Sequence, residues 1–73
     1  MNRLAVNLRR LRKGRGWTQQ ELAGKANVPQ SSIHYIERGV RNPRVSTVEK
    51  LAVALGVDIV ELLREWPADR PGR

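Results

Sequence analysis

The chain has 73 residues and no cysteine, and its formal net charge is +7. This length allows one small domain, and without thiols neither a disulfide framework nor a zinc site of the usual kind is expected. No apolar run approaches the ~20 residues that a membrane span requires, and no signal-peptide core follows the first residues. We therefore expect a soluble, cytoplasmic, single-domain protein.

The positive charge is confined to the first part of the chain. Residues 1–44 contain ten lysines and arginines against two glutamates, a net +8, whereas residues 45–73 carry −1. Eleven of the fourteen cations are arginine, whose planar guanidinium suits bidentate phosphate contacts. The asymmetry favours a polyanionic partner, with nucleic acid first. A solubility charge or an anionic membrane surface is the alternative.

The first expected helix covers about residues 2–13. Leu4, Leu8 and Leu11 recur at the i, i+4, i+7 spacing of one helix face, and the glycines at positions 14 and 16 end the pattern.

The second expected helix covers about residues 18–27. Thr18 is an N-cap candidate, and Glu21 three residues later completes the pattern of a capping box. Asn27 tolerates the left-handed conformation of a tight turn, so we expect the helix to end there.

The stretch PQSSIHYIER, residues 29–38, has helical spacing but an unusual polar face. Ile33 and Ile36 would face inward, Pro29 suits the first helical position, and Gly39 suits the C-cap. An idle surface helix would usually carry Glu, Lys and Ala where this one has serines, glutamine, histidine and tyrosine. Its outer face therefore requires another explanation than contact with water.

Two more helices are expected in the second half of the chain. Ser46 or Thr47 would cap one that ends before Gly56, and Asp58 would cap another that runs to Trp66. No segment has the alternating pattern of a strand.

These elements predict an all-α fold, a compact bundle of five short helices. The domain would span residues 1–66, and the polar segment 67–73, which contains proline and glycine, would be a disordered tail.

The second and third helices, joined by a tight turn, have the layout of a helix-turn-helix. The sequence TQQELAGKANVPQSSIHYIERG closely resembles the helix-turn-helix of the phage repressor and Cro family, also called the xenobiotic-response-element type. The resemblance covers about residues 3–63 and includes LRRLR, IERG, NPR and VEKLAVALGV. It implies a lambda-repressor-like DNA-binding domain whose helix-turn-helix lies at about residues 18–38.

The resemblance also implies that the helix at residues 29–38 reads bases. Gln30 matches a position that reads an adenine edge, and an amide can pair bidentately with adenine N6 and N7. Ser31 and Tyr35 match other base-contacting positions one helical turn apart, and His34 lies beside them. Tyr35 departs from the small or amide side chains usual at its position, so its base preference stays open. The alternative is that Tyr35 packs against its own helix.

Backbone contacts are implied at further positions. Gln19 matches a residue that contacts a phosphate and braces Gln30. Arg44 matches a loop arginine that enters the minor groove in some relatives, and an ordinary phosphate contact or solvation is the alternative. The remaining candidates for phosphate contacts are Arg12, Ser32, Arg38 and Arg41. Arg12 also matches one half of a family ion pair, whose other half is Glu37, between the first and third helices.

We expect the protein to bind double-stranded DNA as a homodimer, because one such module contacts only a few base pairs. The expected interface consists of Val57, Val60 and Trp66 in the less basic half. Two-fold symmetry then predicts a pseudo-palindromic operator with half-sites about 34 Å apart. The alternative is that the core fully occupies the fifth helix, which leaves a monomer or a dimer that forms only on DNA.

The sequence thus predicts a sequence-specific transcriptional regulator, a small repressor or Cro-like controller, and no enzyme. His34 is the single histidine and has no second ligand spaced for a metal, and the serines lack a His/Asp constellation. We expect no metal, cofactor, small-molecule ligand or membrane partner. The alternative function is that of a protein-interaction adaptor with the same fold and no DNA readout.

Overall fold

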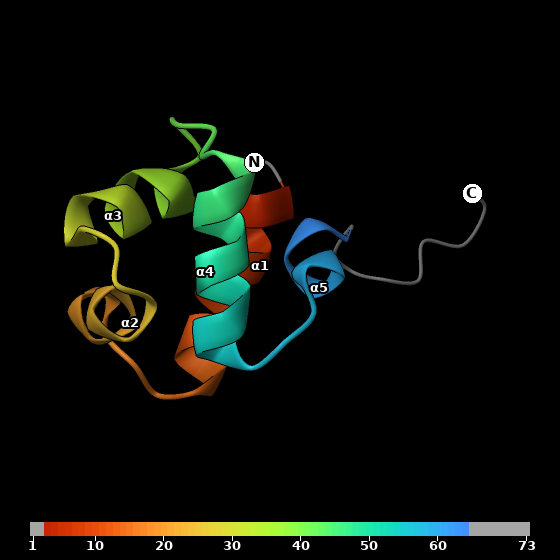
Figure 1. The fold of residues 1–73 in the computed structure, drawn as a ribbon. Helices are drawn as coiled ribbons and strands as arrows, with labels where there is room; N and C mark the ends of the chain where they lie inside the picture. The colour runs from red at the N-terminus through yellow and green to blue at the C-terminus, as the bar shows by residue number, and fades with distance from the viewer. Residues whose placement is uncertain (1–2, 65–73) are drawn as a thin grey trace.

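The computed structural model describes residues 3–64, and helices make up most of this range (Figure 1). No strand occurs within it, so the expected all-α fold with five helices is confirmed. In chain order the helices are α1 (Arg3–Gly14), α2 (Gln19–Ala26), α3 (Gln30–Arg38), α4 (Val45–Leu55) and α5 (Ile59–Leu63). The expected tail at residues 67–73 and the expected interface residue Trp66 lie outside the described residues.

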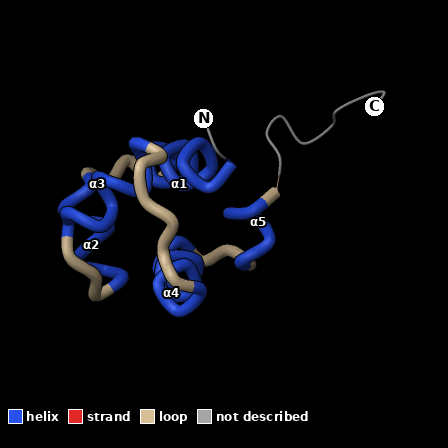
Figure 2. The backbone as a smooth tube through the Cα atoms, turned by 90° about the horizontal axis from the view of Figure 1, so that it is seen from above, coloured by secondary structure: helices blue, strands red, loops and turns tan. Residues whose placement is uncertain are grey.

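One core of leucine, isoleucine and small side chains joins all five helices. Helices α1 and α4 lie in the middle, with α2 and α3 on one side and α5 on the other (Figures 1 and 2). The periodic apolar positions of the sequence supply this core, because each helix turns its apolar stripe inward. The large apolar side chains with less than 2% exposure are Leu8, Leu22, Ile33, Ile36, Leu51, Leu55 and Leu62.

Local caps define both ends of α2, and the second of them opens the turn to α3. The Glu21 amide donates to Thr18 Oγ1 at 3.0 Å, and the Thr18 amide donates to Glu21 Oε1 at 2.8 Å, so the expected capping box is present. Asn27 closes α2 at φ 58°, in the left-handed region, as expected. Pro29 is extended and precedes α3, so the expectation that it opens the helix is wrong by one position.

The expected cap is absent at the start of α4 and present at the start of α5. Neither Ser46 nor Thr47 caps α4, because the helix already begins at Val45 and the Arg44 carbonyl accepts from the Thr47 amide at 3.0 Å. Asp58 does cap α5, since its Oδ1 accepts from the Val60 amide at 3.1 Å.

The end of α5 depends on Asn7, a fully buried side chain of α1. Its Nδ2 donates to the Leu62 carbonyl at 3.0 Å and also to the Arg64 carbonyl. These bonds satisfy carbonyls that the end of a helix would otherwise leave unpaired, and they tie α5 to α1. Helix α5 ends at Leu63 with Arg64 as its C-cap, and the expected end at Trp66 lies outside the described residues.

Arg12 of α1 and Glu37 of α3 form a bidentate ion pair. Arg12 Nε lies 2.7 Å from Glu37 Oε2, and Nη2 lies 2.9 Å from Oε1; both residues are buried. Arg12 Nη1 also donates to the Trp17 carbonyl at 2.7 Å. The hydrogen bonds to Glu37 raise the pKa of Arg12 above its ordinary value. A raised pKa contributes stability that is lost only as the pH rises through it, so Arg12 stays charged near neutrality.

We predict that Asn7→Ala lowers the free energy of unfolding by about 1–3 kcal/mol, because it removes both bonds to the end of α5. Urea unfolding followed by circular dichroism measures this change. Arg9→Ala, at an exposed position of the same helix, is the control and should stay close to the parent protein. Asn7→Asp keeps the size but turns a carboxylate toward two carbonyls, so parental stability in this variant would contradict the assigned role.

We predict that Glu37→Ala lowers the free energy of unfolding by about 3–5 kcal/mol, because it leaves the Arg12 charge buried without its partner. The free energy of unfolding of a domain of this size is on the order of 4–11 kcal/mol, so the variant should lose much of its thermal stability. The melting temperature is the measurement.

The matched control for Glu37→Ala is Glu61→Ala, which breaks the exposed pair between Glu61 and Arg64 at 3.1 Å. Exposed pairs contribute ~0–1 kcal/mol, so this variant should melt close to the parent. An equal fall in melting temperature in the two variants would show that the buried Arg12–Glu37 pair contributes no more stability than the exposed pair.

Candidate nucleic-acid interface

Helix α3 is fixed on its inner face and open on its outer face. Ile33 and Ile36 are buried in the core, and Glu37 holds the ion pair with α1. The outer side chains carry most of the polar groups expected to read bases. Those exposed on α3 are Gln30, Ser31, His34, Tyr35 and Arg38, whereas Ser32 is half-buried.

Tyr35 projects from α3 between two neighbouring side chains. Its ring lies 5.3 Å from the His34 ring in an edge-on arrangement, with an angle of 69° between the planes. The guanidinium carbon of Arg41, from the loop after α3, lies 4.8 Å from the Tyr35 ring centre. The ring is 39% exposed, so it is supported from within the protein and still open to a ligand.

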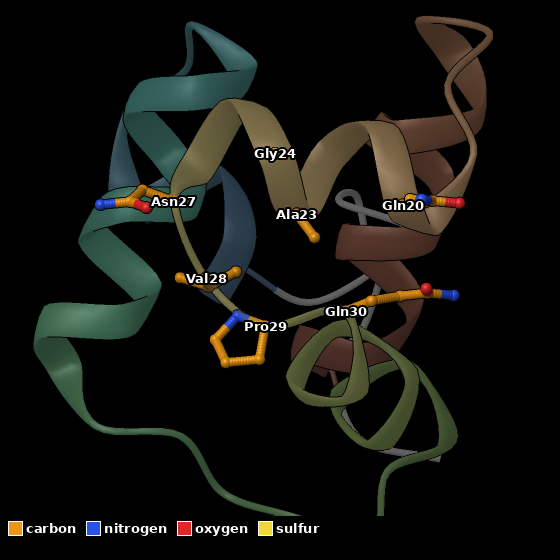
Figure 3. A pocket seen from close by; sticks show the side chains of 7 residues that line it. All are labelled: Gln20, Ala23, Gly24, Asn27, Val28, Pro29 and Gln30. Carbon is orange, nitrogen blue, oxygen red and sulfur yellow. The ribbon is translucent and has the colours of Figure 1, made fainter.

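An open groove runs along the turn between α2 and α3. In Figure 3 Gln20 of α2 and Gln30 of α3 extend to the same side of this turn, while Asn27 points away from them. Ala23 is buried at the crossing, where its small side chain lets the two helices approach closely. Gln20 was missed by the sequence reasoning, although its place beside Gln19 at the start of α2 was the available signal.

Gln19, which was expected to brace Gln30 and contact a phosphate, makes a hydrogen bond that was not expected. Its Nε2 donates to Glu37 Oε1 at 3.1 Å, so in the described part of the chain it extends the buried ion pair. This contact links the start of α2 to the end of α3 and keeps Gln19 half-buried at the edge of the outer face.

Some cations of the first 44 residues contribute to the fold, and others are exposed near α3. Arg12 is held by Glu37, and Arg15 donates from Nη2 to the Leu55 carbonyl at the end of α4. Both arginines stabilise the fold, Arg12 through the buried ion pair and Arg15 because a cation stabilises the C-terminal end of a helix. Those exposed at the end of α3 and in the following loop are Arg38, Arg41 and Arg44.

Lys25 also contributes to the fold, through its contact with Trp17. Trp17 is half-buried against the core, and Lys25 Nζ lies 4.8 Å from its ring centre. Both side chains therefore contribute to the packing beside α2 rather than to the outer face of α3.

The residues expected to form a dimer interface lie in different surroundings. Val57 packs partly against the core, while Val60 is 58% exposed. Three further exposed apolar side chains of α4 and α5 were missed: Val45 at 68% and Val53 at 80% on α4, and Leu63 at 46% on α5. Apolar residues off the buried stripe of each helix were the signal for them.

Two other kinds of site can be assessed for residues 3–64. No group of three or more His, Cys, Asp or Glu residues lies close enough to hold a metal ion in this range. None of its helices has the length and apolar content of a membrane span.

Known proteins share this arrangement over most of the chain. The helix-turn-helix family model HTH_3 matches residues 8–62. An uncharacterized HTH-type transcriptional regulator, y4dJ of Sinorhizobium fredii, is 46% identical over 57 residues, which cover 78% of this chain and 74% of the relative. Several other curated relatives are longer, and the match spans between 20% and 57% of their length.

Two solved structures resemble the chain closely. The restriction-modification controller protein C.AhdI of Aeromonas hydrophila superposes with a TM-score of 0.80 at 34% identity, over 84% of this chain and 92% of that one. The N-terminal DNA binding domain of SinR from Bacillus subtilis gives 0.81 at 34% identity, over 86% and 93%. The family model and these similarities show that the chain belongs to the HTH_3 family of helix-turn-helix proteins.

Proposed function

We propose that the protein is a sequence-specific DNA-binding transcriptional regulator, a small repressor or controller. The observation that carries this proposal is the outer face of α3, where amide, hydroxyl and aromatic side chains lie next to exposed arginines. Family membership supports the same conclusion, because regulators of this family bind DNA.

In this proposal α3 lies in the major groove of double-stranded DNA and reads base edges. Gln30 offers an amide whose donor and acceptor match adenine N6 and N7. Ser31 is short enough to let the helix approach the bases, and His34 and Tyr35 extend the readout by one turn. The buried ion pair below α3 fixes its direction, so little freedom is lost on binding.

The exposed arginines supply the part of the affinity that does not depend on sequence. Arg38 and Arg41 would contact phosphates beside α3, and Arg44 would contact a phosphate or enter the minor groove. Gln19 and Ser32, both half-buried at the edge of α3, would add neutral contacts to the backbone. Arg12 faces Glu37 and is the weakest of the phosphate candidates.

A homodimer would double the number of bases read. The exposed apolar side chains of α5, Val60 and Leu63, favour a surface there that a second copy covers, with Val57 at its edge. Two-fold symmetry would then place two α3 helices about 34 Å apart on one side of the DNA.

We predict that selection from a random pool of duplexes returns a symmetric consensus, with half-sites about one helical turn apart. Binding to the selected duplex should weaken steeply as salt rises, since several phosphate contacts release counterions. A protein-interaction adaptor with this fold would yield no consensus and would lose little affinity with salt. An asymmetric consensus would leave the DNA reading intact and contradict the homodimer.

We predict that Gln30→Ala costs about 1–3 kcal/mol at one base pair of each half-site and relaxes the preference there. Equilibrium binding to the selected duplex and to duplexes changed at single positions measures this effect. Arg38→Ala is the control, which should weaken all duplexes by a similar factor and flatten the salt dependence. A uniform loss in Gln30→Ala would show that Gln30 does not read a base.

A further inference from the structure

The loop after α3 turns back toward the outer face of that helix. Gly39 adopts φ 74°, a left-handed conformation that glycine permits, and its amide donates to the Ile36 carbonyl at 3.0 Å. The next amide, of Val40, donates to the Tyr35 carbonyl at 3.2 Å. The chain is therefore directed back over the last turns of α3, and Arg41 follows at once.

This path brings the Arg41 guanidinium over the Tyr35 ring, with its carbon 4.8 Å from the ring centre. The distance lies within the ~6 Å range of a cation–π interaction, and a guanidinium can also stack flat on an aromatic ring. His34 lies against the same ring at 5.3 Å. Tyr35 is thus held by a neighbour on α3 and by a residue of the loop.

We propose that Arg41 is a positioning residue for Tyr35, so that part of the sequence preference depends on an arginine that need not touch a base. This inference rests on the proposed DNA-binding function. The guanidinium restricts the rotation of the phenol ring and leaves its hydroxyl and free edge for the bases. A tyrosine without this support would lose rotamer freedom on binding, which weakens its discrimination.

The proposal separates Arg41 from the other exposed arginines. A plain phosphate contact contributes to every duplex alike, because phosphates carry no sequence information. A residue that orients a base reader contributes more to the preferred duplex than to a scrambled one. The quantity that distinguishes the two roles is the ratio of the dissociation constants for the scrambled and selected duplexes.

The experiment is a double-mutant cycle on this ratio, with the parent protein, Tyr35→Leu, Arg41→Ala and the double variant. The strength of an exposed cation–π contact corresponds to a change of about two- to fivefold, so Arg41→Ala should lower the ratio by that factor. The double variant should be no worse than Tyr35→Leu alone, because Arg41 acts on the preference through the ring. Arg41→Lys, which keeps the charge, should retain affinity for scrambled DNA.

The control cycle pairs Tyr35→Leu with Arg44→Ala, the removal of another exposed arginine of the same loop. Whatever Arg44→Ala does to the ratio, its effect should multiply with that of Tyr35→Leu. If the effects of Arg41→Ala and Tyr35→Leu also multiply, or if Arg41→Ala leaves the ratio unchanged, the positioning role is wrong.

Nuclear magnetic resonance of the free protein tests the contact without DNA. The Tyr35 ring current should shift the side-chain protons of Arg41 upfield, and Tyr35→Leu should abolish this shift while the Arg44 protons stay unchanged. An absent shift overturns the proposal by itself. A protein that prefers no duplex would instead refute the proposed function, so the two failures can be told apart.

Discussion

The arrangement of the outer face depends on one buried ion pair. Arg12 and Glu37 are 25 residues apart in sequence and bind through two short hydrogen bonds, while the remaining Arg12 nitrogen group donates to the Trp17 carbonyl. Gln19 adds a bond to the same carboxylate. Three segments therefore meet at one charged group: α1, the start of α2, and α3. Apolar packing alone would tolerate small rotations of α3, whereas a bidentate pair specifies its direction.

Much of the fold could be predicted from two local features of the sequence, the spacing of apolar residues and the residues that cap helices. Leucine and isoleucine spacing places the helices and their buried faces, and Thr18 and Asn27 mark the ends of α2 because their side chains suit those backbone positions. The errors lie at boundaries where several groups compete. At the start of α4 the Arg44 carbonyl accepts from the Thr47 and Val48 amides, which places Ser46 and Thr47 inside the helix and not at its cap.

The candidate site was predictable to the extent that it follows helix geometry. Residues opposite Ile33 and Ile36 had to face outward, which places Ser31 and Tyr35 on the exposed side. Contacts across long separations could not be foreseen in the same way. The Arg41–Tyr35 contact depends on the path of a loop, and the bonds of Asn7 join positions 55 or more apart.

Two side chains of α1 connect it by hydrogen bonds to the helices on either side of it, α5 and α3. Asn7 binds the end of α5, and Arg12 binds Glu37 of α3. The two residues are five positions apart on α1, which corresponds to a rise of about 7.5 Å along the helix axis. In a two-fold dimer joined near α5, α1 would fix the distance between the dimer interface and the α3 helix that contacts the DNA. The distance between half-sites would then be set by a helix that reads no base.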